Sequence, residues 1–429
     1  MDHLPEKRMR SLGRVLAKAF NEGEPQAEGS DLGDRILHQA MGKAGPRPQY
    51  DSFDLNDDTL SRISKIAEEK ALAPDLLDEL LALPLPERET AVAVQSRFQT
   101  YSLAAHTLQR CAKAVFHDPV SARELARLAR TITGQADPRA CGGAAALTDL
   151  QAYSLAMEGN ALRLAGDLDG ALVLFEEARQ AQGKGGADPD LAARIDHLEA
   201  SLRRDLRQYS ASLRLLDRAQ KMFSALQDHD QKARTIINRS NVYLVKGDFE
   251  EAISTLRGAL DVSCSPELAW TLRHNLIDIL AKSGRPREAA QLFEQTRPLY
   301  REHSDPLTNC RRVWVEGIIA RELGNLDLAS DLLHQASEGL AEHGYSVASA
   351  LAGLDLVAVY AMQDQASEVL RVASDLVRLF QMRKVHPETF AALSLVHQAA
   401  QREAVSLSLL AQATAQIQKS GGMYETAAS

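Results

Sequence analysis

A turn signal that returns at nearly constant intervals constrains this chain more than any other feature. The stretch GNALRLAGDLDGALVLFEEA, residues 159–178, predicts two helices joined at Gly166. Gly159 and Ala171 are small enough to let the two helices touch, and Phe175 fills the space beside them. The sequence therefore predicts a helical hairpin at this place.

The same plan recurs along the chain. Turn positions fall at intervals of 41, 40, 37, 40 and 40 residues, at Gly166, Arg207, Gly247, Gly284, Gly324 and Asp364. Five residues later stand Ala171, Ser212, Ala252, Ala289, Ala329 and Val369, and four further on stand Phe175, Leu216, Leu256, Phe293, Leu333 and Ala373. A small residue followed by a bulky one is thus repeated, and only the last unit departs from it.

This pattern resembles the tetratricopeptide (TPR) repeat, in which Gly-Asp marks the turn and small and aromatic residues follow at fixed spacing. The resemblance implies an all-α fold: a right-handed TPR-like superhelical solenoid of about seven to eight helical hairpins with atypical terminal caps. Since the TPR period is about 34 residues, these units are expected to carry longer helices or loops.

Changes in composition and in the placement of prolines divide the chain into further segments. Residues 1–52 are expected to be a basic helix plus flexible linker, and 53–98 a helical N-terminal cap whose short runs are broken at prolines such as Pro74. TPR-like repeats are expected over 99–385, a C-terminal capping hairpin over 386–420 and a frayed tail over 421–429.

Charge and composition exclude several classes. The formal charge of -9 argues against direct nucleic-acid binding, because a phosphate-binding protein usually presents a basic face. No apolar run is long enough to span a membrane. The four cysteines show no metal-ligand or paired spacing, and neither a metal nor a cofactor is expected. The expected location is the cytoplasm, and the oligomeric state is not fixed by the sequence.

No catalytic motif stands out. The twelve histidines show no HExxH or comparable pair. GKGG at residues 183–186 lacks the strand, spacing and Ser or Thr of a phosphate loop, and is interpreted as a flexible loop between helices. We therefore expect no enzymatic activity.

In TPR proteins the first helix of each hairpin lines the inner curve. Carried onto this register, the resemblance implies a partner-binding stripe at Asn160, Arg163, Arg194, His197, Arg204, Arg234, Asn241, His274, Arg311, Trp314 and Arg321. Arginine and asparagine suit carboxylates and peptide backbone. An equally weighted interpretation is that these arginines only pair with acidic residues of adjacent units.

One further unit has a different character. Its equivalent face is apolar, with Leu351, Leu354, Ala358, Ala361 and Met362. This patch is expected either to receive apolar side chains of a partner or to be covered by the C-terminal hairpin, and we favour the second interpretation.

From residue 75 onward, segments such as LLDELLALPLPERETAVAVQSRFQTYSLAAHTL and WTLRHNLIDILAKSGR resemble a group of bacterial, non-catalytic TPR proteins. Some of these are regulators with a DNA-binding domain before the repeats, and residues 1–56 contain no recognisable domain of that kind. The expected function is a scaffold or regulator that binds an acidic or extended peptide segment of a partner. The alternative is a sensor of a small peptide or nucleotide-like ligand.

Overall fold

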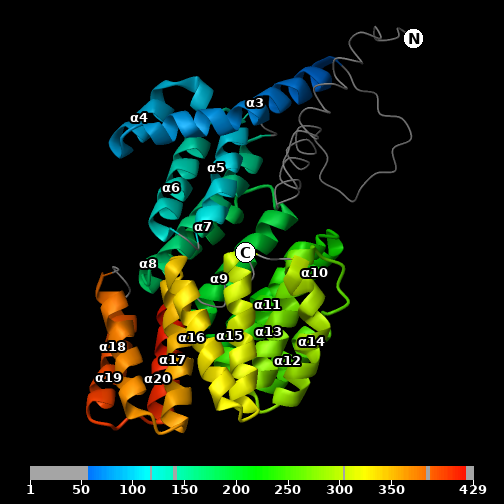
Figure 1. Cartoon of the computed structure of the whole chain (residues 1–429). Coiled ribbons are helices and arrows are strands. Elements are labelled where there is room, and N and C mark those ends of the chain that lie inside the picture. The colour runs from blue at the N-terminus through cyan, green and yellow to red at the C-terminus, as the bar shows by residue number, and fades with distance from the viewer. Residues whose placement is uncertain (1–56, 116–117, 139–142, 303–304, 383–386, 422–429) are drawn as a thin grey trace. The chain divides into compact units, whose positions relative to one another are not determined.

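Antiparallel helices pair along this chain in sequence order (Figure 1). The computed structural model describes residues 57–115, 118–138, 143–302, 305–382 and 387–421. Within these ranges there are α-helices and one short 3-10 helix but no strand, which confirms the predicted all-α class. Contacts divide the chain inside α9 (Pro189–Asp205) into two units, Met1–Glu199 and Ala200–Ser429, which are described separately.

Consecutive helices form the hairpins of both units. In the first unit these are α5 (Tyr101–Ala114) with α6 (Pro119–Gln135), and α7 (Ala144–Leu164) with α8 (Leu168–Gln182). The second unit, which begins inside α9, contains α10 (Tyr209–Ala225), α11 (His229–Lys246), α12 (Phe249–Arg257), α13 (Pro266–Lys282), α14 (Pro286–Glu302), α15 (Pro306–Glu322), α16 (Leu326–Glu342), α17 (Ser346–Met362), α18 (Ala366–Met382), α19 (Pro387–Gln401) and α20 (Leu407–Gly421).

The six predicted turn positions all adopt left-handed backbone, with φ between 55° at Asp364 and 89° at Gly247. At the first of them the Asp167 N–H reaches the Leu162 carbonyl at 2.9 Å, which satisfies a carbonyl at the end of α7. Arg207 and Asp364 hold this conformation without the freedom of glycine. The predicted repeat register is therefore confirmed.

The small and bulky positions that follow each turn are buried, as predicted. Ala171, Ala252, Ala289 and Ala329 are fully buried, and so are Leu216 and Leu333. A Cβ added to Gly159 would lie 3.1 Å from the Phe175 ring, so this close approach of α7 and α8 requires a small residue. Contact between helices through small residues thus fixes the geometry of the hairpin.

The additional length of each unit lies in the helices and not in the loops. α15, α16, α17 and α18 each contain 17 residues, and short turns join them. α12 is the exception, because it contains 9 residues and leaves 258–265 to connect it to α13. This short helix explains the single 37-residue interval.

Three elements precede the first hairpin: α3 (Asp57–Ala82), α4 (Leu85–Val94) and a 3-10 helix (Ser96–Phe98). α3 contacts α5 and α4 contacts α6. The predicted helix break at Pro74 is wrong, because α3 continues through this residue. Ala73, Leu77 and Leu80 are buried on both sides of the proline, and their packing offsets the one backbone hydrogen bond that it removes.

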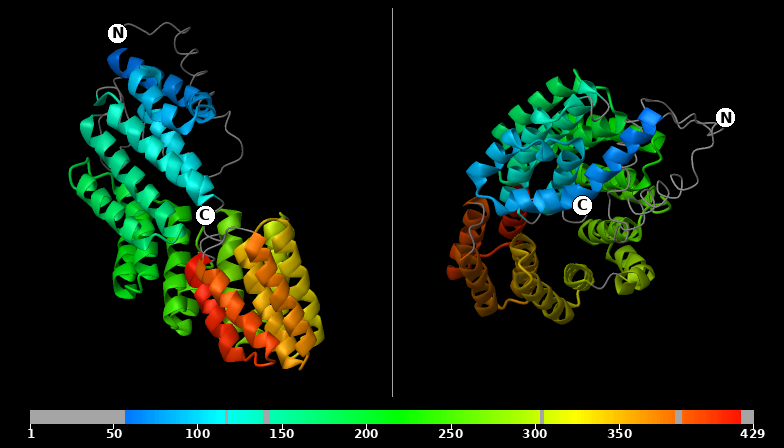
Figure 2. Two further views of the ribbon diagram at one scale, coloured as in Figure 1. Left: turned by 90° about the vertical axis from the view of Figure 1, so that its left-hand side faces the viewer. Right: turned by 90° about the horizontal axis from the view of Figure 1, so that it is seen from above.

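The last four helices of the second unit form a closed group, coloured orange to red in Figure 2. α17, α18, α19 and α20 pack in sequence, and α20 also contacts α17. Leu351, Leu354 and Ala358 on α17 are buried, whereas Met362 is exposed. α20 thus contacts the helix that carries this patch, and covering of the patch by the C-terminal hairpin stays a prediction.

Some predicted segments fall outside the described residues. These are the basic helix and linker of 1–52 and the tail beyond 421. The boundaries of the cap, of the repeat array and of the C-terminal hairpin stay predictions, as does the right-handed superhelix.

Candidate partner-binding site

The first helices of successive hairpins contact one another in the second unit. α11 contacts α13, α13 contacts α15, and α15 contacts α17 (Figure 1). All predicted site residues lie on such first helices: Asn160 and Arg163 on α7, Arg194, His197 and Arg204 on α9, Arg234 and Asn241 on α11, His274 on α13, and Arg311, Trp314 and Arg321 on α15. They are distributed over the two units, which are considered in turn.

In the first unit the predicted residues interact mainly with each other and with nearby acids. Asn160 and Arg163 are both buried, and Arg163 Nε donates to Asn160 Oδ1 at 2.9 Å. Arg194 Nε donates to the buried Asp190 carboxylate at 2.8 Å, one turn away on α9. His197, also on α9, is half-buried.

Two arginines of the second unit connect neighbouring first helices. Arg204 donates to Asp205 at 2.9 Å and to Asn238 Oδ1 on α11 at 3.4 Å. Arg321 donates to Asp355 Oδ1 on α17 at 2.7 Å. Both arginines occupy the sixteenth position of their helix, and both acceptors the tenth position of the next first helix. The same inter-repeat contact thus occurs at two joints.

Asp355 has a second donor. Trp314 Nε1 donates to Asp355 Oδ2 at 2.9 Å, and the Trp314 ring is 8% exposed. Arg321 also donates to Glu322 at 2.9 Å. Pairing with an acidic residue of an adjacent unit, one of the two interpretations offered for the arginines, therefore describes Arg321, whereas the acidic partners of Arg194 and Arg204 lie on their own helix, α9.

Arg234 and Arg311 have a different electrostatic environment. Burial lowers the pKa of Arg234 to about 10, and the attraction of Glu267 opposes this shift. Burial likewise lowers the pKa of Arg311 to about 10, against the attraction of Asp305, Tyr345 and Glu267. Each guanidinium remains charged at neutral pH but has lost more solvation than its neighbours restore.

His274 belongs to an aromatic cluster between α13 and α14. Its Nδ1 lies 2.9 Å from the Tyr300 hydroxyl, and its ring stacks on Trp270 with centroids 5.1 Å apart. Burial, and then the nearby Arg311 and Lys282, lower the pKa of His274 to about 3. His274 is therefore neutral at physiological pH and supplies no positive charge to the site.

The residues predicted from the sequence did not include Asn238, Glu267, Trp270 and Asp355. A register signal for two of them existed, because Asn238 and Asp355 hold the same position in α11 and α17 as acceptors for the preceding helix. The positions carried over from the TPR resemblance did not include this one. No signal in the sequence distinguishes Glu267 from the many exposed glutamates.

The GKGG segment connects α8 and α9, as predicted, and its C-terminal end is anchored to α7; its flexibility stays a prediction. The buried Asp149 carboxylate on α7 accepts the Gly186 N–H at 2.9 Å and the Asp188 N–H at 3.4 Å. Burial raises the pKa of Asp149, and these backbone donors oppose the shift. The glycines let the backbone approach the carboxylate closely.

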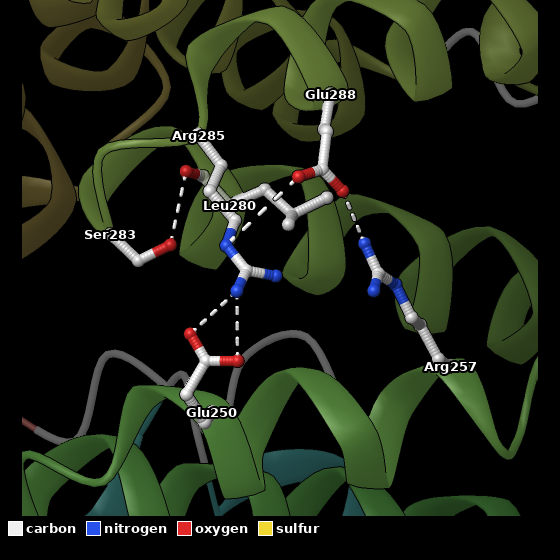
Figure 3. Close-up of polar contacts among 6 residues, drawn as sticks. All are labelled: Glu250, Arg257, Leu280, Ser283, Arg285 and Glu288. Carbon is white, nitrogen blue, oxygen red and sulfur yellow. Dashed lines mark hydrogen bonds and ion pairs between the residues drawn. The ribbon is translucent and has the colours of Figure 1, made fainter.

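Ion pairs near the surface join α12 to α14 and to the turn that precedes α14 (Figure 3). Arg285 donates to both oxygens of Glu250 at 2.8 and 2.9 Å, and Arg257 pairs with Glu288. Solvent-exposed pairs of this kind contribute about 1 kcal/mol or less. They supply matched control positions for the arginines on the first helices.

Within the described ranges, no three His, Cys, Asp or Glu side chains are grouped as metal ligands would be. Among the same residues, no helix combines the length and the apolar character needed to cross a bilayer.

Stacked helical hairpins, with left-handed backbone at the six predicted turns, define a helical-repeat fold of the TPR type. A family model described as PPR repeat matches residues 274–297, which run from α13 into α14. No curated protein matches the chain.

Solved structures show the same kind of fold. A Rap protein complexed with competence and sporulation factor is 12% identical and has a TM-score of 0.53, covering 76% of this chain and 94% of that chain. The apo quorum sensor NprR from B. thuringiensis is 12% identical, with a TM-score of 0.47 and coverage of 92% and 98%. Yeast Tom70 is 14% identical, with a TM-score of 0.43 and coverage of 94% and 82%. At these identities the likeness concerns the fold, and of these three only the Rap structure exceeds a TM-score of 0.5.

Proposed function

We propose that this protein is a non-catalytic, cytoplasmic scaffold or regulator that binds an acidic or extended segment of a protein partner along the first helices of its hairpins. The observation that carries the proposal is the placement of the buried Arg234 and the half-buried Arg311 on α11 and α15. A partly desolvated guanidinium gains most from an anionic partner that brings its own oxygen acceptors.

The internally paired arginines have a supporting role in this proposal. Arg204 and Arg321 hold the next first helix through Asn238 and Asp355, so they fix the spacing of the surface. Asn241, which is 2% exposed, contributes an amide on the same helix as Arg234. Arg234 and Arg311, on alternate first helices, are the positions at which this proposal is tested.

The test begins with the full chain. Tagged wild-type protein captures candidates from lysate of the native host, mass spectrometry identifies them, and a purified candidate is then titrated by calorimetry. Arg234→Gln and Arg311→Gln are each expected to weaken binding about tenfold, which corresponds to about 1.4 kcal/mol. Arg285→Gln, in the turn before α14, removes the same charge and is expected to change affinity less than about twofold.

Equal affinities for wild type, Arg234→Gln and Arg311→Gln would show that the partner does not bind at these two arginines. A purified candidate that fails to bind the wild-type protein directly would count against the scaffold function itself. Melting curves of all variants show whether any loss of binding reflects unfolding.

A sensor of a small peptide is the second candidate, because the Rap structure, which has this fold, contains competence and sporulation factor. A sensor binds a short synthetic peptide with a rise in melting temperature, following mass action. Stabilisation by such a peptide with no stable protein partner would favour the sensor. Co-purification of a protein with no peptide effect would favour the scaffold.

A further inference from the structure

The inter-repeat contact described above is interrupted at α13. In its complete form an arginine at the sixteenth position of one first helix donates to the tenth residue of the next, as Arg204 does to Asn238. The sixteenth residue of α11 is Leu244, whose side chain has no donor, although the tenth residue of α13 is again an asparagine, Asn275. α11 contacts α13, so this joint keeps the acceptor and lacks the donor.

The two equivalent asparagines show what the missing arginine changes. Asn238 is buried, accepts from Arg204 at 3.4 Å and donates to Ser201 Oγ at 3.0 Å. Asn275 is half-buried, and its carboxamide makes no hydrogen bond with any of the described residues. The first amide is therefore satisfied within the protein, whereas the second keeps a carbonyl oxygen and an NH2 group for another molecule.

The joint between α13 and α15 is interrupted in the complementary way. One repeat later, Trp314 at the ninth position of α15 donates to Asp355, the tenth residue of α17. His274 is the ninth residue of α13, but the tenth residue of α15 is Val315, whose side chain accepts no hydrogen bond. His274 therefore lacks the acceptor that the equivalent residue of the next repeat has.

His274 has a donor to offer at this position. Its Nδ1 lies 2.9 Å from the hydroxyl of Tyr300, which is buried and has no other partner among the described residues. Donation from this hydroxyl to Nδ1 satisfies both groups. The ring is neutral, because burial lowers the pKa of His274 to about 3, so its one proton lies on Nε2. His274 is half-buried, and no described residue accepts from its Nε2.

We propose that His274 and Asn275 form a subsite on α13 for the main chain of the bound segment. Asn275 Oδ1 accepts a main-chain N–H of the segment, and Asn275 Nδ2 and His274 Nε2 donate to its main-chain carbonyls. A carboxamide and a neutral imidazole offer hydrogen bonds without charge, which suits peptide groups of any sequence. This inference rests on the proposed function and names the part of the partner that α13 recognises.

Loss of the Asn275 carboxamide should affect binding and not folding. Asn275→Ala is expected to weaken binding about tenfold and to leave the melting temperature unchanged, because no internal hydrogen bond is lost. Asn238→Ala should lower the melting temperature, since Ser201 and Arg204 lose a partner. Gln295→Ala removes an exposed carboxamide from α14 and is the matched control, with an expected change in affinity of less than about twofold.

The experiment uses the full chain, with fluorescein-labelled hexaglutamate as the probe and fluorescence anisotropy at fixed ionic strength as the measurement. A second probe is the same peptide with every main-chain nitrogen methylated, which keeps the carboxylates and carbonyls but has no main-chain N–H. Wild type is expected to bind the methylated peptide about tenfold more weakly than the first. Asn275→Ala should bind the two peptides within about twofold of each other, because it has already lost the acceptor.

The donor of the subsite is tested by His274→Phe, which keeps a ring beside Trp270 and removes Nε2. This variant is expected to bind both peptides about threefold more weakly, since methylation leaves the carbonyls in place. Its melting curve shows whether it is folded at the temperature of the titration. Unchanged affinity of the folded variant would overturn the role of His274.

A third variant supplies the missing donor from within the protein. Leu244→Arg places a guanidinium at the position from which Arg204 reaches Asn238, and it is expected to bond Asn275, raise the melting temperature and weaken peptide binding about fivefold. Val245→Arg is the matched control, because it adds the same charge at the next residue, which is exposed. Added positive charge alone would tighten the binding of hexaglutamate.

The proposal is overturned if Asn275→Ala binds as tightly as Gln295→Ala, or if it loses as much affinity on methylation as wild type does. Binding by Leu244→Arg as tight as by Val245→Arg also overturns it, and so does the absence of wild-type binding below about 1 mM. A captured partner that is weakened by Arg234→Gln and Arg311→Gln but indifferent to Asn275→Ala leaves the proposed function intact and removes the subsite. Failure of every captured protein and of both peptides to bind removes both.

Discussion

A single methyl group in the loop after α8 provides a sharp test of the packing described above. A Cβ on Gly185 would lie 1.9 Å from Oδ1 of Asp149 and 2.8 Å from its Cγ. Asp149 is 3% exposed, so its carboxylate has little room to move. Gly185→Ala therefore forces the loop away from α7 and disturbs the hydrogen bond from the Gly186 N–H.

The expected cost combines two effects. Overpacking a well-filled site costs about 1–3 kcal/mol, and loss of a hydrogen bond to a buried charged acceptor costs about 1.5–3 kcal/mol. Because the loop can relax, we expect Gly185→Ala to lower the free energy of unfolding by about 2–4 kcal/mol. Gly183→Ala is the matched control, since its Cβ would approach nothing closer than 3.6 Å and its φ is -65°. That variant is expected to change stability by less than about 0.5 kcal/mol.

Guanidinium unfolding followed by circular dichroism measures the difference between the two variants. Amide exchange in the peptide that spans 183–188 gives a local measurement, because the Gly186 amide should lose protection in Gly185→Ala only. Equal unfolding midpoints for the two alanine variants would refute the anchoring of this loop by Asp149.

Three further predictions concern the second unit. Asp355→Ala leaves Trp314 and Arg321 without their shared acceptor and should lower the free energy of unfolding, measured in urea, by about 2–4 kcal/mol. The control variant Asp375→Ala, at an exposed position, should lower it by less than about 0.5 kcal/mol. Similar unfolding midpoints for the two variants would contradict the role of Asp355. Arg207→Gly removes the steric strain of a non-glycine residue in left-handed backbone, and it should raise the free energy of unfolding by about 0.5–1 kcal/mol and the melting temperature with it. An unchanged or lower melting temperature would contradict this prediction.

Because the folded pKa of His274 is lowered to about 3 from 6.5, stability should fall as pH is lowered from 6.5 toward 3, by roughly 2 kcal/mol at pH 5; His274→Gln should flatten this dependence in unfolding measurements, and an unaltered pH profile would disprove it.

The repeat register was predictable because it depends on local chemistry. Left-handed turns are indicated by Gly166, Gly247, Gly284 and Gly324, and a contact between helices is indicated by Ala or Ser five residues after the turn. Even Arg207 and Asp364, which lack the glycine signal, were placed correctly because their neighbours follow the same spacing. The break predicted at Pro74 failed, since the packing of α3 against α5 outweighs the local preference of proline.

The candidate site was less predictable, because charges on different helices act on one another only after packing. The sequence places Arg234, Arg311 and Arg321 on first helices but does not reveal which acid faces which arginine. In the structure Arg321 on α15 meets Asp355 on α17, and Arg204 on α9 donates to Asn238 on α11. Pairing across 34 residues or more is a property of the inter-helix spacing.

The sequence by itself determined the helical hairpins, their turns and their small-residue contacts, because each depends on residues within one forty-residue unit. Only the tertiary structure decided that α20 contacts α17, that Asp149 anchors the end of the GKGG segment and that Arg321 of α15 meets Asp355 of α17. Burial and electrostatic pairing depend on distances between units, and no pattern along one helix specifies those distances.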